Sequence, residues 1–126
     1  MIKQNIVFVE NKAGSLKRVT GLLANNNINI YGFACFDAPE FAIFRMICDD
    51  PDKAEIILNQ SGYMNRITQA IVVDMKDQVG GLDELLKIMA DSNVSLDYIY
   101  TSFHRKDLRP VVILHSEDIT VTESVL

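Results

Sequence analysis

The stretch VENKAGSL (residues 9–16) decides the fold, because the chain repeats it as MKDQVGGL (residues 75–82). The spacing is 66 positions, from 9 to 75 and from 16 to 82, and it continues without a gap through residues 27–30 and 93–96. The apolar positions between these segments coincide as well: Val19, Leu22 and Leu23 fall on Leu85, Ile88 and Met89. Self-similarity at one fixed spacing indicates duplicated structural units.

Each copy predicts the same local structure. A run rich in Ile and Val, at 4–9 or 70–75, predicts a strand, and a glycine-containing turn follows it. Residues 15–25 and 81–92 then carry apolar side chains at helical spacing. We expect one buried face on each helix: Leu16, Val19, Leu22 and Leu23 in the first copy, and Leu82, Leu85, Leu86 and Met89 in the second.

A hairpin follows each predicted helix. Its strands are 28–36 and 41–48 in the first copy, and 94–103 and 110–115 in the second. Asp50-Pro51-Asp52 begins a second helix over 52–60, and a short strand over 63–68 completes the first copy. The order β-α-β-β-α-β is the split βαβ arrangement, an α+β ferredoxin-like fold with an antiparallel sheet and helices on one face.

The second copy is abbreviated. After Asp118 only residues 119–126 remain, which are too few for a helix and a strand. The β-branched alternation of Ile119-Thr120-Val121-Thr122 leaves two interpretations: a fourth strand with the second helix shortened or missing, or a truncated end. We therefore predict two modules, residues 1–68 and residues 69–126.

Composition argues against several functional classes. Twelve Lys and Arg against 17 Asp and Glu give a net charge of −5, and the cations are scattered, which disfavours nucleic-acid binding. Apolar runs are far shorter than the ~20 residues that span a bilayer, so we expect no membrane contact and a cytoplasmic location. Cys35, placed opposite about Ala42, and Cys48, opposite about Asn29, are expected to be free thiols.

The sequence lacks the patterns of catalytic and metal sites. His104 and His115 fall at opposite ends of one predicted hairpin, with no Cys near either. There is no Cys-x-x-Cys motif and no glycine-rich phosphate loop. An acylphosphatase-like site would need an arginine in the first strand-to-helix loop, where Lys12 stands. We predict that the protein is not an enzyme and has no cofactor.

Both copies resemble ACT domains, the ligand-sensing modules of amino-acid metabolism. The segments that carry the resemblance are Phe8–Leu16 with Gly21–Ile30, and Val73–Leu82 with Val94–Leu96. Each resembles the order found in the family: a strand, then a polar residue two positions before an Ala-Gly or Val-Gly pair, then a leucine and a helix. The resemblance covers nearly the whole chain, which is similar to small stand-alone tandem ACT proteins of bacteria. It implies a non-catalytic regulatory protein that binds a free amino acid or similar small metabolite.

The second strand of a split βαβ sheet lies at an edge, so 28–36 and 94–103 would each expose unpaired backbone groups. Pairing these edges antiparallel would give one eight-stranded sheet, which resembles known ACT pairs, and would place each strand start beside the other module's turn. One ligand site would then combine Asn11, Ala13, Gly14, Ser15 and Leu16 with Ser95, Leu96 and Asp97. The other would combine Asp77, Val79, Gly80, Gly81 and Leu82 with Asn29, Ile30 and Tyr31.

At each turn, N–H groups of a helix N-terminus would hold a ligand carboxylate. Asn11 and Asn29 match asparagines that hold the effector in the serine-binding ACT domain of phosphoglycerate dehydrogenase. That domain has a histidine in place of Val9. The second copy of this chain has Asp77 and Ser95 instead of the two asparagines. The resemblance therefore does not imply that the ligand is serine. Asp77 would instead accept hydrogen bonds from a ligand ammonium group, and this second site is the preferred one.

Each of these residues also has a purely structural interpretation. Asn11 and Asp77 are types that cap helices and turns, and Asn29 and Ser95 suit an edge strand. The aromatic residues of the predicted strands are expected in the core or an interface: Tyr31, Phe33, Phe36, Tyr98, Tyr100 and Phe103. The alternative function is a ligand-independent module that docks on a metabolic enzyme as a regulatory subunit. The sheet face left uncovered beside the short tail predicts a homodimer.

Overall fold

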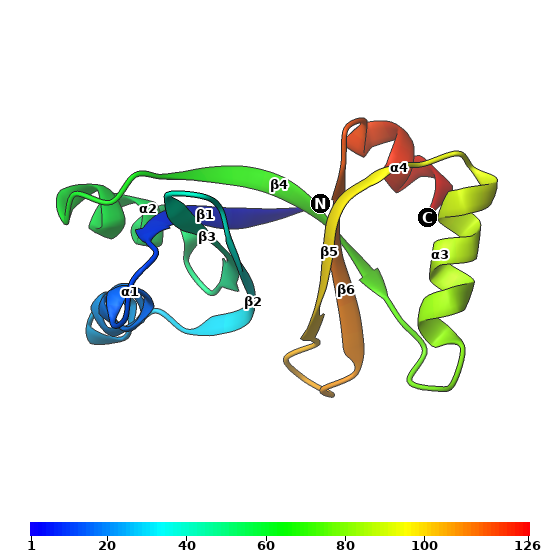
Figure 1. Cartoon of the computed structure of the whole chain (residues 1–126). Coiled ribbons are helices and arrows are strands. Elements are labelled where there is room, and N and C mark those ends of the chain that lie inside the picture. The colour runs from blue at the N-terminus through cyan, green and yellow to red at the C-terminus, as the bar shows by residue number, and fades with distance from the viewer. The chain divides into compact units, whose positions relative to one another are not determined.

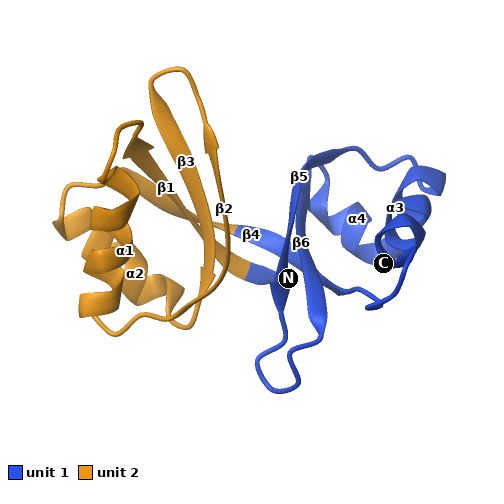
Figure 2. Cartoon of the chain, turned by 60° about the horizontal axis from the view of Figure 1, so that its bottom comes forward, with its two compact units in different colours: residues 1–2, 69–126 blue, residues 3–68 orange.

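The computed structural model describes all 126 residues, Met1–Leu126, and divides into two compact units (Figure 2). Unit 2 comprises Lys3–Thr68, and unit 1 comprises Gln69–Leu126 together with Met1–Ile2. The elements, labelled in Figure 1, are β1 (Ile2–Glu10), α1 (Ser15–Asn25), β2 (Ile30–Asp37), β3 (Phe41–Cys48), α2 (Pro51–Gln60), β4 (Asn65–Asp74), α3 (Gly81–Asp91), β5 (Leu96–Phe103), β6 (Pro110–Ser116) and α4 (Ile119–Val125).

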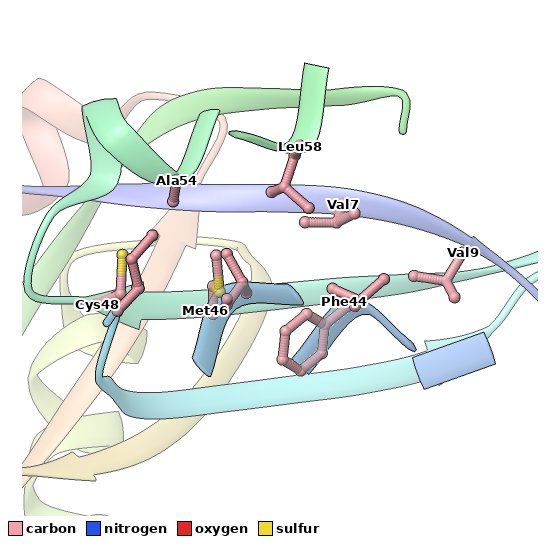
Figure 3. Close-up of a cluster of buried hydrophobic side chains, with 10 residues drawn as sticks. Val7, Val9, Phe44, Met46, Cys48, Ala54 and Leu58 are labelled. Atoms are coloured by element: carbon pink, nitrogen blue, oxygen red, sulfur yellow. The ribbon is translucent and has the colours of Figure 1, made fainter. Parts of the chain in front are cut away.

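Unit 2 has a sheet with α1 and α2 on one face (Figure 2). β3 pairs antiparallel with β1, from Asn5↔Met46 to Glu10↔Phe41, and antiparallel with β2. Alternate side chains of β1 and β3 point toward the helices and form the core, as Figure 3 shows for Val7, Val9, Phe44, Met46 and Cys48. Ala54 and Leu58 of α2 meet them from the helix side. Val19 and Leu23 of α1 close this core, so the helix face predicted from the sequence is the face that is buried.

Unit 1 repeats this layout with β4, β6 and β5. β6 pairs antiparallel with β4, where Ile71 lies opposite Leu114, and with β5, where Ile99 lies opposite the same Leu114. The core of unit 1 is smaller and joins the sheet to α3: Ile71, Leu85, Met89, Val112 and Leu114. Partly buried Ile119 of α4 packs against it.

The α+β ferredoxin-like architecture is confirmed, but the predicted eight-stranded sheet is wrong. There are six strands, in the order β2-β3-β1-β4-β6-β5. The two strands expected at 63–68 and 70–75 are one continuous strand, β4, because no turn residue interrupts residues 65–74. β2 and β5 are the first and last strands of this order. Pairing of the two units through these strands stays a prediction.

The C-terminal tail is a helix and not the strand that its β-branched residues suggested. Asp118 is the N-cap of α4, and its side chain accepts a hydrogen bond from the Val121 N–H at 3.1 Å. The Thr122 hydroxyl is buried against Ser116 Oγ at 2.6 Å and lies 2.9 Å from the Asp118 carbonyl. The N-terminal ammonium of Met1 pairs with Glu123 at 2.9 Å. These contacts outweigh the weak helix propensity of Ile, Val and Thr.

Replacing the cap, Asp118→Ala, is expected to lower the free energy of unfolding by about 1 kcal/mol, because the Val121 N–H loses its acceptor. Asp50, which caps α2 through the Lys53 N–H at 3.1 Å, provides the matched comparison, and Asp50→Ala should lower it by a similar amount. Urea unfolding followed by circular dichroism measures both. An unchanged midpoint for Asp118→Ala would contradict the capped helix.

The two cysteines are free thiols, as predicted, although the hairpin register differs from the expected one. Cys35 lies opposite Phe44, and Cys48 lies opposite Ile30, so the two residues occupy different rungs of the β2–β3 pair. The expected partners Ala42 and Asn29 are wrong because the turn is tighter and Asp37 pairs with Ala42. Burial raises the pKa of both thiols, which favours the protonated form.

Candidate functional site

The two copies of the repeated stretch form the same turn between a strand and a helix. We call residues 10–15 the first turn and residues 76–81 the second turn. Gly14 and Gly80, each the N-cap of its helix, have φ values of 85° and 86°. This left-handed conformation favours glycine and explains why both copies keep one at this position.

The second turn closes tightly on itself. The Gln78 N–H donates to the Lys76 carbonyl at 2.9 Å, and the Gly81 N–H donates to the Gln78 carbonyl at 3.0 Å. A Cβ at Gly81 would lie 2.1 Å from the Lys76 carbonyl oxygen, so this position accepts no side chain. Gly80 offers no side-chain cap to α3. The N–H groups of Leu82 and Asp83 therefore have no acceptor within the chain.

The polar side chains of the first turn are bound within unit 2. Asn11 Nδ2 donates to Asp37 Oδ1 at 2.7 Å, and Lys12 Nζ pairs with Glu10 at 2.8 Å. The hydrogen bond and the charge of Lys12 hold the pKa of the Glu10 carboxyl below its ordinary value. The amide of Asn11, predicted as a ligand contact, is thus already engaged by β2.

The second turn differs at the equivalent positions. The Asp77 carboxylate has no hydrogen-bond or ion-pair partner in the chain, whereas the neighbouring Lys76 pairs with Glu84 at 3.3 Å. The position equivalent to Asp37, 66 residues later, is Phe103, which has no carboxylate to offer. Asp77 therefore remains available to a cationic group of a ligand.

A cavity of about 590 Å³ lies at the second turn, lined by residues 75–83 and Leu86. Two cavities flank the first turn. One of about 250 Å³ is bordered by the end of β2, and one of about 260 Å³ is lined by Arg18 and by Gly62, Tyr63 and Met64. Small-molecule sites usually measure roughly 300–1,000 Å³. Of these three cavities, only that of the second turn reaches this size.

The other predicted site residues lie at the opposite end of each unit's sheet. Asn29, Ile30 and Tyr31 are at the start of β2, and the Asn29 N–H donates to Asp49 Oδ1 at 3.1 Å. Ser95, Leu96 and Asp97 are at the start of β5, where Asp97 Oδ2 lies 2.8 Å from His115 Nδ1. The structure thus brings together the members of each turn. The combination of one unit's turn with the other unit's strand stays a prediction.

Sequence reasoning missed part of the second-turn cavity. Met75, Lys76, Gln78, Asp83 and Leu86 line it but were not among the predicted site residues. The signal for Leu86 was present, because it stands one helical turn after Leu82 on the same side of α3. The sequence alone instead predicts Leu86 in the core.

Three further features of the chain concern metal binding, the His115 imidazole and the membrane. No group of three or more His, Cys, Asp or Glu side chains is arranged to hold a metal ion. His115, which pairs with Asp97, also stacks on the Tyr98 ring with centroids 5.4 Å apart. None of the four helices has the length and apolar character needed to cross a membrane.

Comparison with known proteins gives a family and several similar structures. The family model described as an ACT domain pair matches residues 1–125. A solved protein of Bacteroides thetaiotaomicron is 29% identical, with a TM-score of 0.88 over 99% of this chain and 85% of that one. The ligand-free regulatory subunit of aspartate kinase from Thermus thermophilus is 15% identical, with a TM-score of 0.64 over 98% and 91% of the two chains.

The regulatory subunit of aspartate kinase from Thermus flavus gives a similar result, with 15% identity and a TM-score of 0.61 over 99% of this chain and 90% of that one. At this level of identity the two kinase subunits indicate a shared fold. No curated protein matches the sequence.

Proposed function

Because the chain belongs to the family of ACT domain pairs, we propose that it is a non-catalytic regulatory protein that senses a free amino acid. The observation that carries this proposal is the cavity of about 590 Å³ at the second turn. It combines an unpaired carboxylate, Asp77, with the N–H groups of Leu82 and Asp83, which have no acceptor. A zwitterionic amino acid has the complementary groups: its ammonium group would face Asp77, and its carboxylate would face the two N–H groups.

The electrostatics support this orientation of the ligand. The N-terminal end of α3 carries partial positive charge, which favours the α-carboxylate of an amino acid. The Asp77 carboxylate favours the α-ammonium group, since hydrogen bonds between ionised groups are roughly twice as strong as neutral ones. The turn is held by its own backbone hydrogen bonds, so little conformational freedom would be lost on binding.

The site at the first turn is not favoured. Asn11 is engaged by Asp37, Glu10 is engaged by Lys12, and the neighbouring cavities are small. Completion of the second-turn site by Asn29, Ile30 and Tyr31, assembly as a homodimer and a cytoplasmic location remain predictions from the sequence. The proposal rests on the cavity within unit 1.

Asp77→Asn is expected to weaken amino-acid binding about tenfold to 150-fold, the equivalent of losing one hydrogen bond to a charged group at about 1.5–3 kcal/mol. A thermal-shift panel of amino acids on the full chain identifies the ligand. At 100 times its dissociation constant, a ligand stabilises the native chain by about 2.7 kcal/mol. Isothermal titration calorimetry then measures the variant.

Asn11→Ala is the matched control, because Asn11 occupies the equivalent position of the first turn. It should leave amino-acid affinity unchanged. If Asn11→Ala weakens binding and Asp77→Asn does not, the ligand lies at the first turn. If no amino acid raises the melting temperature, the sensor proposal fails.

A second candidate function is docking on a metabolic enzyme without a ligand. It is favoured by exposed apolar side chains at α3, including Ile88, which is 46% exposed and lies outside the cavity. Contiguous exposed apolar surface often marks a protein interaction site. The same thermal-shift panel separates the two functions, because a docking module responds to no amino acid.

A further inference from the structure

The apolar face of α3 is divided between the core and the second-turn cavity. Leu85 and Met89 are buried in the core of unit 1. Leu82 and Leu86, expected from the sequence to be buried with them, are 47% and 36% exposed and line the cavity instead. Val79, in the second turn, lines the same cavity and is fully exposed. Three aliphatic side chains thus meet solvent around one hollow.

The first copy of the repeat shows that the fold does not require two of these three side chains, whereas Leu82 has an equivalent leucine, Leu16. The positions equivalent to Val79 and Leu86, 66 residues earlier, are Ala13 and Thr20. The two turns nevertheless share their backbone conformation, with φ values of 85° and 86° at the N-cap glycine. The larger apolar side chains therefore belong to the cavity of the second copy and not to the construction of the turn.

The charged side chains of the cavity disfavour an anionic ligand side chain. Asp77, Asp83 and Lys76 are the ionisable residues of its lining, and Lys76 is paired with Glu84 at 3.3 Å. An acidic side chain would meet two carboxylates and no unpaired cation. With Asp77 assigned to the ammonium group, the apolar surface that remains for the ligand side chain is that of Met75, Val79, Leu82 and Leu86.

We propose that this cavity selects amino acids with an aliphatic side chain, which would cover Val79, Leu82 and Leu86. The inference rests on the proposed function and adds the ligand class. Removing apolar surface from water is favourable in proportion to the area covered. Each additional methylene on the ligand should therefore tighten binding about fourfold, which corresponds to about 0.8 kcal/mol.

The test is a calorimetric titration of the full chain with a homologous series. Alanine, 2-aminobutyrate, norvaline and norleucine share the same charged groups and differ only in methylenes. Their affinities should rise about three- to fourfold per step. Leu86→Thr introduces the residue type that the first copy has at the equivalent position, Thr20. This variant should reduce the gain in affinity per methylene, while the affinity for alanine stays nearly unchanged. Ile88→Thr, on the same helix but outside the cavity, should leave the whole series unchanged.

Aspartate and lysine complete the experiment. If either binds more tightly than norleucine, or if the four homologues bind equally, the aliphatic selectivity is wrong while the amino-acid sensor stands. If Ile88→Thr reduces the rise in affinity along the series as much as Leu86→Thr does, the ligand side chain does not lie against Leu86. If none of the six ligands binds, the aliphatic selectivity is wrong. The proposed function fails with it only if no other amino acid raises the melting temperature in the thermal-shift panel.

Discussion

Gly81→Ala is expected to lower the free energy of unfolding by about 3 kcal/mol or more, the upper part of the range for overpacked sites. The added Cβ would lie 2.1 Å from the Lys76 carbonyl oxygen, a backbone atom that cannot rotate away. Relieving the clash requires the second turn to open. That movement would break the hydrogen bonds from Gln78 to Lys76 and from Gly81 to Gln78, and amino-acid binding at the cavity should be lost with them.

Gly21→Ala is the control for this experiment. Gly21 lies inside α1, and the nearest atom to its added Cβ is Lys17 Nζ at 3.1 Å, the end of a flexible side chain. Alanine in a helix interior is favoured over glycine by about 0.5–1 kcal/mol, so this variant should be more stable than the native chain. Urea unfolding measures both changes. A Gly81→Ala chain with the native midpoint would show that the turn accommodates a side chain.

Phe44→Ala is expected to lower the free energy of unfolding by about 3–5 kcal/mol. The Phe44 side chain, 1% exposed, extends from β3 into the unit 2 core, between Met46 and Val9 in Figure 3. Its removal loses apolar burial and leaves a cavity, because the neighbouring side chains are anchored on β1, β3 and α1 and can only partly collapse into the space.

Phe33→Ala separates this effect from the general loss of an aromatic ring. Phe33 contacts Phe44, with ring centroids 5.9 Å apart, but is itself 61% exposed. Its loss should lower stability by about 1 kcal/mol, the value of an aromatic pair with little burial. The midpoints of urea unfolding give the comparison. Equal losses for the two variants would contradict the core position of Phe44.

Several parts of the fold and the candidate site follow from local sequence. The 66-residue repeat predicts the paired turns, because a glycine at the N-cap can take the left-handed conformation found at Gly14 and Gly80. The helices and hairpins follow from apolar spacing. The predicted start of the second helix is confirmed to within one residue, since Pro51 and Asp50 are local start signals. The preference for the turn at Asp77 over that at Asn11 remains a proposal.

The sequence by itself therefore determined the duplication, the turns, and the helix and hairpin of each copy, since each depends on residues close together in the chain. Tertiary contacts decided the rest. They made residues 119–125 helical, through the buried Thr122 and Ser116 hydroxyls, despite β-branched alternation. They also left Leu82 and Leu86 exposed, because helical spacing defines an apolar face but not which element covers it. The cavity at the second turn exists for that reason.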